Sequence, residues 1–228
     1  ALLLGGVLAG VLLGCPALAQ EDPAALLRLL ALKANDNQEE VAKSLADRLL
    51  SAMPAKVDPA FVAEVEAAGP AEAARLLAMI ILRSDVPEFR KEGMTLLEKA
   101  VAATSAAATE NLALILLEGR HGQARDTARA IELLRRARQM PGAKEAHRLL
   151  GDLALRGEGM PKDVALAIEY YLRGAEAGSV GCRIALHRLY RDPEGGAHDP
   201  VAAEQQGRAA VESGSAEAAY ELGIYYER

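Results

Sequence analysis

The sequence predicts an all-α protein built from repeated pairs of helices. Its composition favours helices, because alanine and leucine dominate, aromatic residues make up only 4% of the chain and tryptophan is absent. A segment of about 36 residues recurs along the C-terminal part of the chain. Within each copy, apolar and small residues recur at helical spacing, and glycine, proline and aspartate separate the helical stretches.

The repeat is clearest between residues 148–179 and residues 184–215, which align at a constant offset of 36. The aligned pairs include Leu150 with Leu186, Leu153 with Leu189, Asp163 with Asp199, Ala167 with Ala203 and Gly178 with Gly214. A constant offset indicates one structural unit that stacks on its own copies.

Further copies flank this central pair. One begins at Gly214 and runs to Arg228, which is the length of a single helix. Weaker copies at residues 110–137 and 92–100 carry the array back to about Ala71.

Each unit is predicted to hold two helices with explicit stops between them. Gly157 and Gly159 suit the left-handed conformation that ends a first helix, and Pro161 prevents its continuation. Asp163 is expected to cap the second helix, as is Asp199 in the next unit. The same glycines do not form a phosphate-binding loop, because such a loop follows a strand and no strand is predicted here.

These residues resemble the Sel-1-like repeat family, a branch of the tetratricopeptide superfamily. The resemblance rests on Ala146, Leu150, Gly151, Leu153, Gly157, Gly159, Asp163, Ala167, Tyr170, Tyr171, Ala175 and Gly178. It implies a right-handed α-solenoid of antiparallel helix pairs. Ala154 at a usual tyrosine position, His187 at a usual glycine position and the turn PEGGAHD depart from the pattern, which predicts looser packing there.

Residues 1–19 are predicted to be a signal peptide. An apolar run is followed by Ala17 and Ala19, which occupy the small-residue positions of a cleavage site, so the mature chain is expected to begin at Gln20. A membrane-spanning helix is the rival interpretation, but the uninterrupted run is shorter than the roughly 20 residues that a bilayer core requires. Leu-Leu-Gly-Cys ending at Cys15 offers a second alternative, a lipoprotein anchored through this cysteine.

Residues 20–70 are expected to form a helical cap on the repeat array of residues 71–228, whose last repeat is incomplete. Three short helices are predicted in the cap. They start at Asp22, Asp36 and Asp58 and run, for the first two, to about Lys33 and Met53.

Composition argues against nucleic-acid binding, because the net charge is −6 and no segment gathers a basic stripe. The histidines His121, His147, His187 and His198 show no metal-site spacing, so neither a metal nor another cofactor is predicted. A nucleophilic pair of Cys182 with a histidine of another repeat is the alternative to a thiol that is simply buried in the core.

The resemblance places partner binding on the concave face, which the first helices of the pairs line. The predicted partner-binding residues are Arg148, Asp152, Arg156, Arg183, Arg188 and Arg191. An ordinary solvated face remains the alternative for this charge pattern.

The predicted function is that of an exported scaffold or adaptor that binds a protein, a peptide or a cell-envelope component. The alternative is a penicillin-binding or β-lactam-hydrolysing enzyme, since some secreted relatives are linked to that chemistry. Those relatives are cysteine-rich, whereas cleavage after Ala19 would leave this chain with Cys182 alone. Self-association is a further expectation, because the final half repeat would expose Tyr220, Leu222, Tyr225 and Tyr226.

Overall fold

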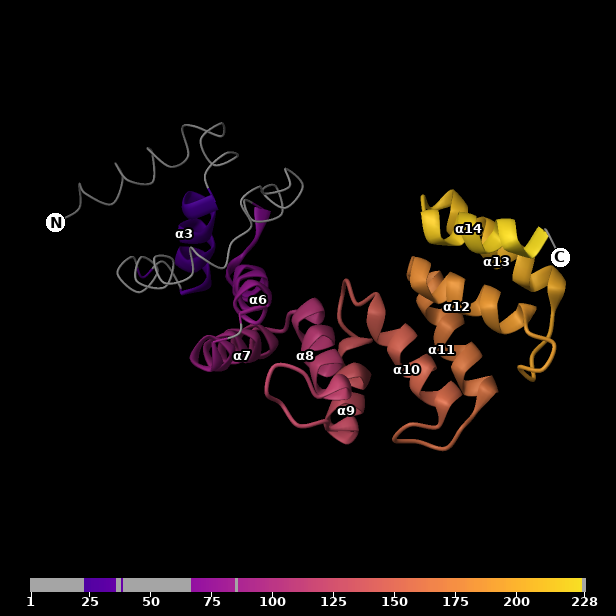
Figure 1. Ribbon diagram of the computed structural model, residues 1–228, viewed down its shortest axis with the longest axis horizontal. Coiled ribbons are helices and arrows are strands. Elements are labelled where there is room, and N and C mark those ends of the chain that lie inside the picture. The colour runs from indigo at the N-terminus through magenta and orange to yellow at the C-terminus, as the bar shows by residue number, and fades with distance from the viewer. Residues whose placement is uncertain (1–22, 36–37, 39–66, 85, 227–228) are drawn as a thin grey trace. The chain divides into compact units, whose positions relative to one another are not determined.

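The computed structural model describes residues 23–35, 38, 67–84 and 86–226. These residues form ten α-helices and no strand, which confirms the predicted all-α class (Figure 1). The chain divides into two compact units, residues 1–108 and residues 109–228. None of the described helices is both long and apolar enough to cross a bilayer. The predicted signal peptide with Cys15, and the second and third helices predicted for the cap, lie outside the described residues.

The first unit contains α3 (Pro23–Ala34), α6 (Pro70–Ile81) and α7 (Pro87–Ala102). Helix α3 confirms the first helix predicted for the cap. Both α6 and α7 begin with proline, whose missing N–H is not needed in the first turn. Helix α6 packs on α3 and on α7, and the Lys99 ammonium ties α7 to α3 by donating to the Ala34 carbonyl at 2.7 Å.

The remaining helices follow one another as pairs. Their bounds are α8 (Ala106–Glu118), α9 (Thr127–Ala137), α10 (Glu145–Arg156), α11 (Val164–Glu176), α12 (Val180–Arg191), α13 (Pro200–Glu212) and α14 (Ala216–Tyr226). We call α8, α10, α12 and α14 the A helices, and α9, α11 and α13 the B helices. Helix α10 packs on α11, α12 packs on α13, and α11 joins the two pairs through its contact with α12.

The turns between the paired helices are built as the sequence predicts. Gly157 ends α10 with φ of 70°, in the left-handed region that glycine enters without strain. Each B helix starts at an aspartate whose carboxylate accepts a backbone N–H of the first turn. These caps are Asp126, Asp163 and Asp199.

The same three aspartates fix the register of the repeats. Their backbone N–H groups donate to the carbonyls of Leu116, Ala154 and Tyr190, each at 2.9 Å. Three identical hydrogen bonds make these carbonyl positions structurally equivalent. Equivalent A-helix residues therefore stand 38 apart between the first two pairs and 36 apart between the next two.

The α10/α11 pair packs a large B-helix residue on a small A-helix residue. Gly151 lies so close to Tyr171 that an added Cβ would come within 2.7 Å of the ring atom Cδ1. In the α12/α13 pair the sizes are exchanged, because His187 replaces the glycine and Gly207 replaces the tyrosine. A Cβ on Gly207 would come within 2.9 Å of Nδ1 of His187.

The predicted looser packing at His187 is therefore wrong. This histidine is 1% exposed, and its Nδ1 donates to the Ala203 carbonyl at 2.8 Å. The ring of Tyr225 meets it edge-on, with 5.7 Å between the ring centroids. The glycine opposite supplies the space that the histidine takes, so the departure at residue 187 and the one at residue 207 compensate each other.

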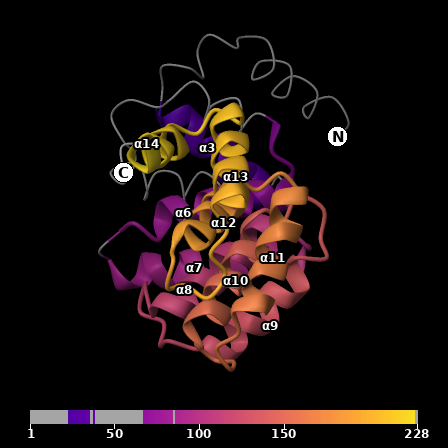
Figure 2. The same ribbon diagram turned by 90° about the vertical axis from the view of Figure 1, so that its right-hand side faces the viewer.

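Helix α14 lies beside α13 in both views (Figure 1, Figure 2). Contrary to the expectation, Leu222 is buried. The Tyr225 and Tyr226 hydroxyls donate to the Pro200 carbonyl and the Glu204 carboxylate of α13, although Tyr226 is 54% exposed, as expected. Tyr220 is 71% exposed, as expected. The half repeat is thus packed along one side and open along the side that carries Tyr220.

Candidate functional site

The predicted partner-binding residues all lie on two neighbouring A helices, α10 and α12. Their side chains meet partners from three other elements of the second unit, and those contacts determine what this surface offers to a ligand.

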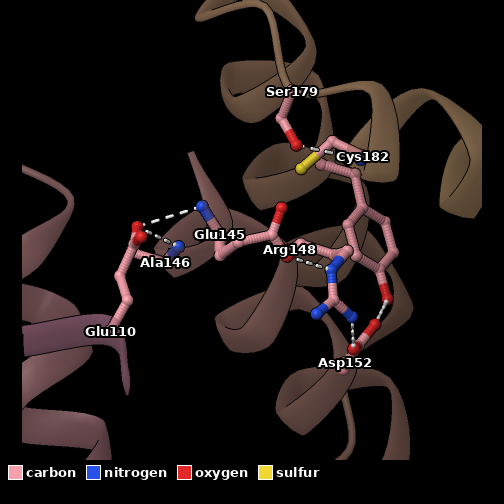
Figure 3. Close-up of polar contacts among 8 residues, drawn as sticks. Glu110, Glu145, Ala146, Arg148, Asp152, Ser179 and Cys182 are labelled. Atoms are coloured by element: carbon pink, nitrogen blue, oxygen red, sulfur yellow. Dashed lines mark hydrogen bonds and ion pairs between the residues drawn. The ribbon is translucent and has the colours of Figure 1, made fainter. Parts of the chain in front are cut away.

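A buried carboxylate joins α8 to α10. Glu110 accepts the backbone N–H groups of Glu145 and Ala146 at 2.9 and 2.8 Å, which caps α10 from the preceding repeat (Figure 3). Lys144, at the N-cap position itself, makes no side-chain cap. Burial raises the pKa of Glu110, although the two N–H groups oppose that shift. The first turn of α10 therefore depends on a residue about one repeat away.

Arg148 and Asp152 form the centre of a polar network on α10. The Arg148 guanidinium donates to the Glu145 carboxylate at 2.6 Å and to the Asp152 carboxylate at 2.8 Å (Figure 3). The Tyr171 hydroxyl of α11 donates to the other oxygen of Asp152 at 2.7 Å. Burial and the neighbouring Asp152 charge raise the pKa of Tyr171, so its hydroxyl stays protonated and keeps donating.

Arg156 and Arg183 make no side-chain contact with that network. Arg156 donates to the backbone carbonyl of Asp152 at 3.3 Å and pairs with Glu158 in the turn after α10, also at 3.3 Å. Arg183 extends to the C-terminal end of α11 and donates to the Ala175 carbonyl at 3.1 Å, where a cation is favoured by the helix dipole.

Arg188 and Arg191 join α12 to α14. Arg188 lies 2.8 Å from the Glu217 carboxylate and 2.9 Å from that of Glu221. Arg191 shares Glu221 at 3.3 Å. Hydrogen bonding to Arg188 lowers the pKa of Glu221, which keeps this carboxylate ionised.

Most arginines of this surface are therefore paired with carboxylates. Arginine charges that the sequence places in a row are matched by Glu145, Asp152, Glu158, Glu217 and Glu221. Sequence reasoning missed Glu110 and the two glutamates of α14 because their partners lie in other repeats. The sequence does contain a signal for Glu110, because this acidic residue directly precedes the apolar stretch NLALILL of residues 111–117.

The structure gives Cys182 the role of a core residue. Its side chain is fully buried, as the sequence predicts, and burial raises the pKa of the thiol to about 11. His147, on the neighbouring A helix, is also buried, and burial together with the charges of Arg138 and Arg173 lowers its pKa. Among the described residues no group of three or more acidic, histidine or cysteine side chains is arranged to hold a metal ion.

Comparison with protein families matches three of the four A helices, α8, α10 and α14, but not α12. The family model of the Sel1 repeat matches residues 106–140, 144–179 and 216–228. These stretches contain the α8/α9 pair, the α10/α11 pair and α14. The chain contains Sel1 repeats. The resemblance stated from the sequence is thereby confirmed.

The α12/α13 pair lies between the matched stretches, although it has the same helix–turn–helix structure as its neighbours. Its exchange of His187 with Gly207 removes both the glycine and the tyrosine that the repeat pattern expects. The helix–turn–helix structure therefore continues through a stretch that the family model does not match.

Solved structures show the same fold. A Sel1 repeat protein from Oxalobacter formigenes is similar with a TM-score of 0.61 at 22% identity, over 91% of this chain and 80% of that one. A protective antigen of uropathogenic Escherichia coli with a Sel1-like repeat fold is similar with a TM-score of 0.59 at 20% identity. That match covers 91% of this chain but 45% of the antigen, so this chain spans less than half of its length. No curated protein sequence matches the chain.

Proposed function

We propose that this Sel1-repeat chain is a non-catalytic scaffold that holds a protein or peptide partner on its A helices. The observation that carries the proposal is the set of cross-links between successive A helices. Glu110 ties α8 to α10, and Arg188 with Arg191 ties α12 to α14. A surface that is ordered before the partner arrives loses little conformational entropy on binding.

The register of the A helices indicates the chemistry of the partner. Leu114 of α8, Asp152 of α10 and Arg188 of α12 are equivalent residues, and Leu114 is 37% exposed. The surface thus changes from apolar at α8 to charged at α12. A partner segment with an apolar anchor at one end and carboxylates at the other would fit it, because such carboxylates can compete with Glu217 and Glu221 for the arginines.

The six predicted residues have different parts in this surface. Arg148, Asp152, Arg188 and Arg191 would meet the partner directly, and Arg156 would lie at its edge. Arg183, which holds the end of α11, would act by positioning the helices.

A site-specific photo-crosslinking amino acid at residue 114 or 188 tests the proposal in the native host. We expect the same partner to be captured from both A-helix positions. Residue 172 is the matched control, because Leu172 of the B helix α11 is comparably exposed at 39%. Capture of that partner from residue 172 with equal yield, or from residue 172 alone, would contradict binding on the A helices.

We further propose that the chain is exported, with a mature N-terminus at Gln20, and that its partner is a component of the cell envelope. The apolar run and the alanines at positions 17 and 19 support export. Intact-mass measurement of the protein from its host is expected to show cleavage after Ala19. A diacylglyceryl group on Cys15 would instead establish the lipoprotein alternative.

The environment of the Cys182 thiol does not support the alternative of a β-lactam-hydrolysing enzyme. Cys182 is buried, and its raised pKa leaves little thiolate at neutral pH. A nitrocefin assay on the purified chain is expected to show no turnover, and turnover at a rate above that of the heat-denatured protein would refute the non-catalytic proposal.

A further inference from the structure

One partly buried arginine of the second unit has no acceptor for its guanidinium group. The partly buried arginines among the described residues of this unit are Arg138, Arg148, Arg183 and Arg191. Arg148 and Arg191 pair with carboxylates, and Arg183 donates to a backbone carbonyl. Arg138, the C-cap residue of α9, forms neither a hydrogen bond nor an ion pair with any residue that the structure describes. Its hydrogen-bonding capacity is therefore unused.

A neighbouring aromatic ring supports the Arg138 guanidinium. Its Cζ lies 5.7 Å from the centroid of the Tyr170 ring of α11, and Tyr170 is 8% exposed. Of the side-chain nitrogens of Arg138 only Nε is buried, and it too lacks a hydrogen-bond partner. The two Nη atoms therefore reach the surface. A guanidinium that rests on a ring keeps its edge free for two parallel hydrogen bonds to a carboxylate.

The chain around Arg138 carries positive charge that nothing balances. The segment from Arg135 to Lys144 contains four basic residues and no acidic one. Arg135, Arg136 and Lys144 are exposed, and none of them pairs with a carboxylate within the described part of the chain. The dipole of α9 favours cations at its C-terminal end but leaves their hydrogen-bond donors free. This arrangement contrasts with the A-helix surface, where most arginines are paired.

A buried histidine is subject to the same excess of positive charge. His147 of α10 is 9% exposed, and its Nδ1 has no hydrogen-bond partner. Burial lowers its pKa, and the positive charges of Arg138 and Arg173 lower it further. Arg173 of α11 is itself paired with Glu169 at 2.8 Å, whereas Arg138 has no such partner. An anion bound at Arg138 would offset the charge that acts on His147.

We propose that the Arg138 guanidinium, supported by Tyr170, binds a carboxylate of an acidic peptide segment, with Arg135, Arg136 and Lys144 attracting the carboxylates that flank it. We call these five residues the α9/α11 site. The site involves the ends and faces of B helices together with the loop that leads into α10. It is therefore separate from the proposed A-helix surface, and a ligand here is a second binding event.

The charge distribution favours a short acidic segment over an extended polyanion. Exposed charges further apart than about 8 Å are largely screened at physiological salt, so a short segment is affected mainly by the local basic residues. A nucleic acid or a membrane would also face the rest of the chain, whose net charge of −6 repels it. The basic residues of the site are also fewer than the contacts that a phosphate backbone typically makes.

Fluorescence anisotropy with a labelled peptide of eight glutamates tests the proposal. The wild-type chain is expected to bind this peptide and not a peptide of eight glutamines. Arg138→Gln should weaken binding by at least about 10-fold, because it removes two charge-assisted hydrogen bonds. Arg208→Gln is the matched control, because Arg208 lies on the B helix α13 and is already paired with Glu204 at 2.7 Å.

Two further comparisons separate the proposed geometry from net charge. Arg138→Lys keeps the charge but loses the paired donors, and is expected to bind nearly as weakly as Arg138→Gln. Tyr170→Leu removes the supporting ring and should weaken binding more than Tyr170→Phe, which keeps it. Melting curves of all variants, followed by circular dichroism, separate a loss of binding from a loss of fold.

Three results would overturn the proposal. The first is an equal loss of affinity in Arg138→Gln and Arg208→Gln, and the second is full binding by Arg138→Lys, since either would show that the peptide responds only to net charge. The third is binding to vesicles of anionic phospholipid that is lost in Arg138→Gln, without binding of the glutamate peptide. That result would assign the site to a membrane surface.

Discussion

The α10/α11 and α12/α13 pairs build the same interface from opposite choices of residue. In the first pair, Gly151 of the A helix receives Tyr171 of the B helix, and in the second, His187 of the A helix is received by Gly207. Both interfaces are buried, and both position the B helix by the same aspartate cap. The repeat therefore requires a certain total volume of side chains between its A helix and its B helix, and either helix can provide the large side chain.

The comparison also explains where sequence similarity ends. The family model matches the α10/α11 pair but not residues 180–215, which contain the α12/α13 pair. A sequence pattern scores each position separately, so His187 and Gly207 count as two departures from it. In the structure they are one change, because the glycine provides the space that the histidine fills.

The largest expected effect is a loss of stability when Gly174 becomes alanine. Gly174 of α11 lies against α10 and α12, and an added Cβ would overlap the Cys182 sulfur and lie 2.9 Å from Cβ of His147. Its equivalent in α13 is Ala210, which is fully buried. Gly174→Ala should therefore lower the free energy of unfolding by about 3 kcal/mol, because close-packed helices must move apart.

Urea unfolding followed by tyrosine fluorescence measures this effect in the second unit alone, since the chain has no tryptophan and its six tyrosines all lie between residues 170 and 226. Ala210→Gly is the reverse change at the equivalent position and should cost about 1 kcal/mol. A smaller cost for Gly174→Ala than for Ala210→Gly would refute the difference between the two pairs.

A smaller effect is expected at Glu110, whose carboxylate caps α10. Glu110→Ala removes the acceptor for one buried and one partly buried N–H group and should cost about 1–2 kcal/mol. Glu110→Gln keeps an acceptor oxygen and should cost less. Equal losses in the two variants would show that the side chain acts through its volume and not through the cap.

The two acidic links between A helices should respond to pH in opposite directions. Burial raises the pKa of Glu110 above its ordinary value of 4.5, so its stabilising contribution is full below that pH and is lost as the pH rises through the folded-state pKa. Hydrogen bonding to Arg188 lowers the pKa of Glu221, so its contribution is present above 4.5 and is lost as the pH falls through the folded-state pKa.

Urea unfolding of the wild type, Glu110→Gln and Glu221→Gln between about pH 4 and about pH 7 separates the two. The stability advantage of the wild type over Glu110→Gln should shrink as the pH rises, and its advantage over Glu221→Gln should grow. A common direction for both differences would contradict the assigned environments.

The smallest effect is expected at Arg188. Its ion pairs with Glu217 and Glu221 are partly exposed, so Arg188→Ala should cost about 0.5 kcal/mol and less at high salt. Lys162→Ala changes an exposed basic residue of a turn and provides the control. A salt-independent loss would show that packing of the arginine stem matters more than its charge.

The sequence predicted those parts of the fold that depend on local chemistry. The cap at Asp163, the left-handed end at Gly157 and the burial of Cys182 each follow from residues within one repeat, and each is confirmed. The links made by Glu110 and Arg188 could not be predicted, because they depend on which side chains meet across repeats. His187 misled the prediction for the same reason, since its compensation at Gly207 lies on another helix.

A double-mutant cycle on Gly151 and Tyr171 tests most directly the claim that volume is shared between the helices of a pair. By register, the α8/α9 pair has Ala113 and Leu134 at these positions, both buried. Gly151→Ala and Tyr171→Leu should each destabilise the second unit in urea. The double variant, which copies the α8/α9 combination, is predicted to be more stable than the sum of the single losses implies by about 1–2 kcal/mol. Strictly additive losses would contradict the claim.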